Sequence, residues 1–86
     1  MPLVVEIVSG HGVEYTVDEV SRVVVRRREA DFDPGSEIAI CPHHAPLLMQ
    51  VQACRMRITR GGTAFERELP AGVLEVHRDR VTVAIT

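Results

Sequence analysis

The fold is decided in residues 54–69, which read CRMRITRGGTAFEREL. In the first half of this stretch, Cys54, Met56 and Ile58 alternate with Arg55, Arg57 and Thr59. Such a period of two is typical of a β-strand with one buried face. The pair Gly61-Gly62 predicts a tight hairpin at this point, because both turn positions need a positive φ that glycine adopts without steric cost. We therefore expect two antiparallel strands joined at this pair.

The same kind of pattern extends over the whole chain. Alternating or β-branched runs predict strands at residues 3–8, 13–18, 22–27, 37–41, 47–52, 54–59, 63–69, 73–77 and 81–86. Turn signals separate them at Gly10 to Gly12, Asp33-Pro34-Gly35, Pro70-Ala71-Gly72 and Arg78-Asp79. With 86 residues, the chain has the size of one domain, residues 1–86. We predict an all-β fold: a small antiparallel β-sandwich of two packed sheets with about nine or ten short strands, with a small barrel as the alternative.

The charge pattern argues against nucleic acid as a partner. All ten basic residues are arginines, and twelve acidic residues leave a net charge of −2. The basic cluster Arg26-Arg27-Arg28 is followed by Glu29, Asp31 and Asp33, which cancel most of its attraction for phosphate. Aromatic residues make up only 3% of the chain, so there is no platform on which bases would stack.

Cysteine content and hydropathy bear on localisation. Cys41 and Cys54 are too few for the disulfide framework of a small secreted domain, and no signal peptide is recognisable. The apolar runs are much shorter than the roughly 20 residues that a membrane-spanning helix needs. The expectation is a cytoplasmic protein without direct membrane insertion.

A proline-bracketed loop precedes the strand expected at residues 47–52. Residues 36–48 read SEIAICPHHAPLL, and Pro42 and Pro46 enclose His43 and His44. Each proline fixes its own φ and pushes the preceding residue toward an extended conformation. A loop that is stiffened in this way loses little entropy on binding, so it is a candidate docking surface.

Two chemical roles of this loop are alternatives. Cys41, His43 and His44, with His11 or His77, offer ligands that suit zinc, but adjacent histidines point in different directions and the paired spacing of zinc fingers is missing. The second role is nucleophilic catalysis, with Cys41 as the nucleophile and His44 as its base, but no acidic residue is clearly placed to orient the histidine. Phosphate loops and paired catalytic carboxylates are also missing. We predict no catalytic residue, metal, cofactor or small-molecule substrate.

The loop also carries a family resemblance. Residues 36–48 resemble the Gly-Glu-x-Gly-Ile-Leu-Pro-Gly-His-Ala-Pro-Leu-Leu signature of the F-type ATP synthase epsilon subunit, in its N-terminal β-sandwich. The segments 5–9, 72–76 and 81–83 resemble the opening strand and the closing strand pair of that domain. Ala39 and His43 stand where the family usually has glycines, and Gln52-Ala53-Cys54 replaces a Pro-Gly. The resemblance does not extend to the C-terminal helical hairpin of the family, so its inhibitory and ATP-binding roles are not expected here.

The resemblance implies a non-catalytic rotor subunit in the central stalk of an F-type ATP synthase. Such a subunit binds the gamma subunit and the membrane c-subunit ring, and it couples ion translocation to ATP synthesis or hydrolysis on the cytoplasmic face of the energy-coupling membrane. By position, the c-ring-facing residues would be Glu37, Pro42, His43, His44, Ala45 and Pro46.

The gamma contact is assigned from the family and from apolar character. Its candidates are Leu47, Leu48, Val73 and Leu74, and the alternative for each is a place in the core. A second functional reading is a stand-alone β-sandwich interaction module that binds metal through the loop of Cys41, His43 and His44. A third is a variant ATPase whose ring loops differ, for which His43→Gly would leave the fold intact and alter docking.

Overall fold

The computed structural model describes residues 1–27 and 36–85, and the described residues form eight β-strands and no helix. The strands are β1 (Leu3–Ser9), β2 (Gly12–Arg27), β3 (Ser36–Ile40), β4 (Leu47–Val51), β5 (Cys54–Arg60), β6 (Thr63–Leu69), β7 (Gly72–His77) and β8 (Arg80–Ile85). With no helix among these residues, none of the described part of the chain forms a helix that would span a bilayer.

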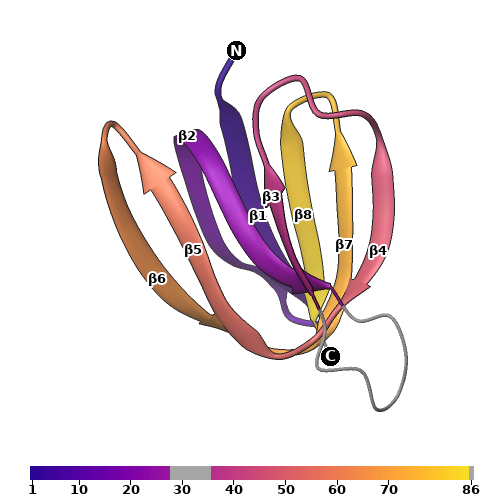
Figure 1. The fold of residues 1–86 in the computed structure, drawn as a ribbon. Helices are drawn as coiled ribbons and strands as arrows, with labels where there is room; N and C mark the ends of the chain where they lie inside the picture. Colours follow the sequence, from indigo (N-terminus) through magenta and orange to yellow (C-terminus); the bar gives the residue numbers. More distant parts are fainter. Residues whose placement is uncertain (28–35, 86) are drawn as a thin grey trace.

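The strands form a sandwich in which β2 belongs to both layers (Figure 1). The first half of β2 pairs with β1, which continues through β8 and β7 to β4. The second half of β2 pairs with β3 on one side and with β5 on the other, and β5 pairs with β6. A single pairing between Arg27 and Val51 joins β2 to β4.

The all-β sandwich is confirmed, but residues 1–27 and 36–85 form eight strands because two predicted strands are parts of β2. The apolar positions Val17, Val20 and Val23 are three residues apart, which breaks the period of two. In the structure Glu19 has a φ of 56°, and the register shifts on both sides of Val20. These irregularities are bulges that bend β2 and keep Val17, Val20 and Val23 directed toward the core in both halves.

One pairing differs from the expected antiparallel arrangement. β1 and β8 run parallel, from Val4 opposite Arg80 to Val8 opposite Ala84. All other strand pairs are antiparallel among the described residues. Hairpin connections give antiparallel neighbours, whereas the two ends of the chain meet only through the tertiary fold.

The core between the layers is entirely apolar within the described residues. Its buried side chains are those of Leu3, Val5, Ile7, Val20, Val23, Val25, Ile40, Met49, Val51, Met56, Ile58, Leu69, Leu74, Val76, Val81 and Val83. They come from all eight strands and follow the alternation of each strand, which is interrupted in β2 between Val20 and Val23. Each fully buried aliphatic side chain stabilises the fold by about 1.5–3 kcal/mol relative to an exposed one.

Two hairpin turns were correctly located by the sequence. Gly61 and Gly62 have φ values of 58° and 80°, and Arg78 and Asp79 have φ values of 50° and 59°. Positive φ at both central positions is the signature of the type I′ turn, whose twist matches that of the two strands. The expected turn at Asp33-Pro34-Gly35, and most of the charged segment before it, lie outside the described residues.

Candidate docking surface

Three separate parts of the chain meet at one end of the sandwich, where Figure 1 shows the β3–β4 loop beside the β7–β8 turn. We call residues 41–46 the proline loop. The backbone N–H of His43 donates a hydrogen bond to Oδ1 of Asp79, in the β7–β8 turn, at 2.6 Å. The backbone N–H of Val4 donates to the carbonyl oxygen of the same Asp79 at 2.9 Å. Asp79 thus joins the proline loop, the turn and the start of β1.

The proline loop contains a defined turn. The carbonyl oxygen of Cys41 accepts a hydrogen bond from the N–H of His44 at 3.2 Å. Pro42 and His43 are the two central residues, and His43 has a φ of 66°. This combination is a type II turn, in which proline suits the first central position and glycine the second. His43 therefore occupies a position for which a side chain is unfavourable.

Asp79 is the residue of this end that sequence reasoning assigned only to a turn. Its side chain is 19% exposed, whereas that of His43 is 76% exposed. Besides the backbone hydrogen bond, Nδ1 of His43 lies 3.9 Å from Oδ2 of Asp79. The signal in the sequence was an aspartate in a two-residue turn, but nothing in the sequence places that turn beside the proline loop.

His44 has an internal hydrogen bond that orients its ring. Nδ1 lies 2.8 Å from the carbonyl oxygen of Ala45. Because a carbonyl oxygen only accepts, Nδ1 must carry the hydrogen, which leaves Nε2 of the neutral ring as an acceptor. His44 is half-buried, and Ala45 and Pro46 beside it are exposed.

Glu37 lies apart from the rest of the predicted ring-facing set. It is the second residue of β3, exposed, and paired with Arg26 of β2. Cys41 is four positions further along the chain, which corresponds to about 13 Å in an extended segment. The structure therefore brings Pro42 to Pro46 together at one end, and a surface that also includes Glu37 must extend along β3.

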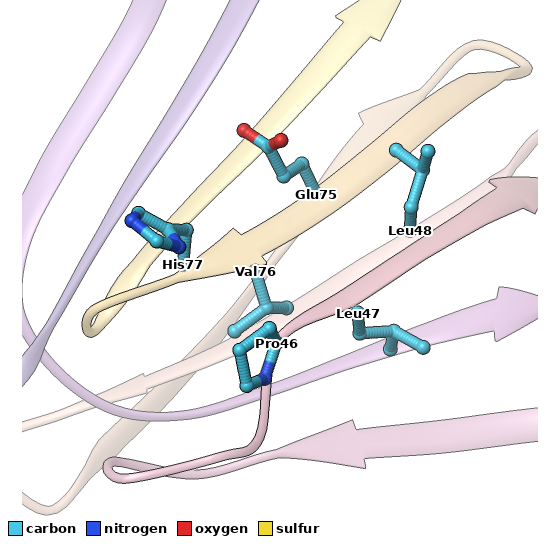
Figure 2. A pocket seen from close by; sticks show the side chains of 6 residues that line it. All are labelled: Pro46, Leu47, Leu48, Glu75, Val76 and His77. Carbon is cyan, nitrogen blue, oxygen red and sulfur yellow. The ribbon is translucent and has the colours of Figure 1, made fainter.

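A shallow groove follows the proline loop along β4 and β7. Figure 2 shows its lining residues, Pro46, Leu47, Leu48, Glu75, Val76 and His77. The side chains of Leu48, Glu75 and His77 lie on one side of the strands and those of Leu47 and Val76 on the other. This alternation makes Leu48 part of the outer face of the sheet.

The four candidates for the gamma contact separate into two groups. Leu48 is 70% exposed and Val73 is 42% exposed, on the outer face. Leu47 is half-buried and packs against the core, and Leu74 is completely buried in it. The core alternative thus holds for Leu74, whose side chain points between the layers and does not reach the surface.

An apolar band crosses the outer face beside the groove. The strand pairings place Val73, Ala84, Val8 and Val13 opposite one another in one row across four strands. Val13 is 61% exposed, Ala84 is exposed and Val8 is half-buried. Sequence reasoning missed this band, because its members are brought together only by the pairing of β8 with β1 and β7. Large exposed apolar patches mark interaction surfaces more often than single exposed residues do.

Residues 1–27 and 36–85 do not form the site that the metal-binding alternative requires. In this part of the chain, no group of three or more His, Cys, Asp or Glu side chains is placed to hold a metal ion. Cys41 is exposed, Cys54 is half-buried, and both are free thiols.

His43→Gly is expected to stabilise the domain by up to about 1 kcal/mol. Glycine removes the steric cost of the positive φ in the folded state, but it also raises the conformational entropy of the unfolded chain, which offsets part of this stabilisation. The measurement is the urea midpoint of the variant compared with wild type. His11→Gly is the control: His11 also lies in an exposed turn, but its φ is not positive. Destabilisation by His43→Gly would show that the imidazole itself holds the turn.

The fold and its outer face define a small β-sandwich domain with a preset loop at one end. The chain belongs to the family of the ATP synthase delta/epsilon chain, β-sandwich domain, whose model matches residues 2–86. It is 36% identical over 64 residues to the ATP synthase epsilon chain of Desulforamulus reducens, an alignment that covers 70% of this chain and 48% of the relative. It is 43% identical over 52 residues to the epsilon chain of Dehalococcoides mccartyi strain BAV1, covering 58% of this chain and 37% of the relative.

A solved structure shares the fold. A chain in the central stalk/c-ring structure of the Tetrahymena thermophila mitochondrial ATP synthase matches with a TM-score of 0.70 at 14% identity, over 100% of this chain and 64% of that chain. The present chain spans about half or less of the length of the curated relatives it matches.

Proposed function

We propose that this chain is a non-catalytic rotor subunit of an F-type ATP synthase, on the cytoplasmic face of the membrane. It binds the gamma subunit and the c-subunit ring and so couples ion translocation to ATP synthesis or hydrolysis. The observation that carries the proposal is the proline loop. This loop lies within the segment that carries the epsilon-chain signature; it is exposed at Cys41, His43, Ala45 and Pro46, and hydrogen bonds at His43 and His44 fix its turn.

The two partners fit two surfaces of different chemistry. The proline loop carries the polar side chains of the exposed His43 and the half-buried His44 on a backbone stiffened by two prolines, which suits the polar loops of a ring. The outer face with Leu48, Val73 and the apolar band offers a surface that a stalk partner would cover permanently. We assign the loop and Glu37 to the ring, and Leu48 and Val73 to gamma.

The experiment is a quantitative pull-down with the gamma subunit from the same genome, followed by reassembly in membranes. Leu48→Ser is expected to weaken gamma binding about tenfold, since the loss of a central apolar contact costs more than about 1 kcal/mol. Glu37→Ala and His44→Ala are expected to keep gamma binding and to lower ion-coupled ATP synthesis in the reassembled complex.

Glu68→Ala is the matched control for Glu37→Ala. Glu68 is also an exposed glutamate on a strand and forms an ion pair with Arg55, but it lies on β6, at the opposite edge from β3 of the layer formed by β3, β2, β5 and β6. It is expected to behave as wild type in both assays. If the wild-type chain shows no gamma binding under mild conditions, the rotor proposal fails; if Glu68→Ala and Glu37→Ala impair coupling equally, the ring-facing assignment fails.

A further inference from the structure

We propose that Asp79 is a positioning residue for ring docking, acting through the backbone of His43. This inference rests on the proposed function, since docking of the proline loop on the c-ring is what Asp79 would promote. Asp79 itself lies in the β7–β8 turn, and its 19% exposed side chain is directed at the loop.

The first step is the conformation of His43. Its φ of 66° is disfavoured for a residue with a Cβ atom, so the isolated loop would leave the type II turn more readily than a loop with glycine there. The hydrogen bond from its N–H to Oδ1 of Asp79, at 2.6 Å, is available only when the turn points this N–H outward toward the carboxylate. A hydrogen bond to an ionised acceptor is stronger than one between neutral groups, so it favours this turn.

The second step is the anchoring of Asp79. Its own φ of 59° lies in the left-handed region, and its carbonyl oxygen accepts the N–H of Val4. Aspartate and asparagine are the side chains that combine tolerance of this region with a short hydrogen-bond acceptor. The backbone of Asp79 is therefore held by β1, β7 and β8, which contribute side chains to the core. Its carboxylate is thereby kept in a fixed position beside the loop.

The third step is the consequence for docking. A loop that already has its bound conformation loses less entropy when a partner binds. Without Asp79, the strained turn at His43 would populate other conformations, and docking would then have to select the correct one. Asp79 thus raises the affinity for the ring through the conformation of the loop, without contacting the ring itself.

Two variants of the full chain distinguish the effect of the Asp79 carboxylate from the effect of its backbone conformation. Asp79→Gly removes the acceptor and fits the positive φ, whereas Asp79→Asn keeps an acceptor oxygen. Arg78→Gly, at the neighbouring position with a φ of 50°, controls for glycine in the same turn. The readouts are hydrogen exchange at the amides of His43 and His44, affinity for the purified c-ring, and affinity for gamma.

In Asp79→Gly, the His43 amide is expected to exchange at least tenfold faster and the ring affinity to fall at least fivefold, with gamma binding unchanged. Asp79→Asn, whose neutral amide oxygen is a weaker acceptor, is expected to fall between Asp79→Gly and wild type, and Arg78→Gly to stay within twofold of wild type. Unchanged exchange in Asp79→Gly would overturn the positioning role, and faster exchange with unchanged ring affinity would overturn its effect on docking. If the wild-type chain does not dock on the ring, the proposed function fails at the ring, while the exchange rates still decide whether Asp79 holds the loop.

Discussion

Leu74→Ala is expected to lower the free energy of unfolding by about 3 kcal/mol, within the range measured for buried leucines. Leu74 is completely buried on β7, between Met49 of β4 and Val83 of β8. The substitution removes apolar surface from the core and leaves a cavity that the surrounding strands fill only in part. Urea unfolding of both proteins, with slopes compared as well as midpoints, measures the loss.

Val73→Ala is the control for this prediction. Val73 precedes Leu74 on the same strand but faces outward and is 42% exposed. Its truncation is expected to change stability by less than about 1 kcal/mol and to act on gamma binding instead. If Val73→Ala costs as much stability as Leu74→Ala, the assignment of the two faces of β7 is wrong.

Gly72→Ala is expected to destabilise the domain by about 3 kcal/mol, the upper part of the usual range for overpacking. A Cβ atom at Gly72 would lie against the carbonyl oxygen of Ala84, well inside contact distance, and 3.1 Å from the carbonyl carbon. These atoms belong to the backbone of β8, so the clash is relieved only if β7 and β8 separate at this point. Thermal and urea unfolding measure the loss.

Gly10→Ala is the matched glycine control. A Cβ atom at Gly10 would meet nothing within 4 Å, and Gly10 does not have a positive φ. The change is expected to be neutral or to stabilise by about 0.5 kcal/mol through the unfolded chain. Equal stability of Gly72→Ala and Gly10→Ala would mean that β7 and β8 do not approach each other as closely as described.

Both core variants bear on the docking surface. β7 forms one wall of the groove and carries Val73, and its pairing with β4 positions Leu48. Displacement of β7 by Gly72→Ala would therefore also disturb the surface that we assign to gamma. Binding of these variants has to be compared on the folded fraction, because unfolding alone would lower apparent affinity.

The sequence by itself determined the local features. Alternation predicted the strand positions, Gly61-Gly62 and Arg78-Asp79 predicted their hairpins, and the two prolines predicted a stiff loop. These signals are local, because the period of two and the need for positive φ concern residues that are neighbours in the chain. Residues 5–9, 36–48, 72–76 and 81–83 carried the resemblance to the epsilon subunit, and the family match over residues 2–86 confirmed it.

Only the tertiary structure decided which elements meet. The period of two shows that Val73 and Leu74 lie on opposite faces, but it does not show which face is buried; packing of the layers decided that Leu74 is core. The parallel pairing of β1 with β8, and with it the apolar band, joins the two ends of the chain. The contact of Asp79 with His43 likewise spans 36 residues of sequence separation. Such contacts form because apolar side chains from all the described strands are buried together, sixteen of them among the described residues, and no single segment has this property by itself.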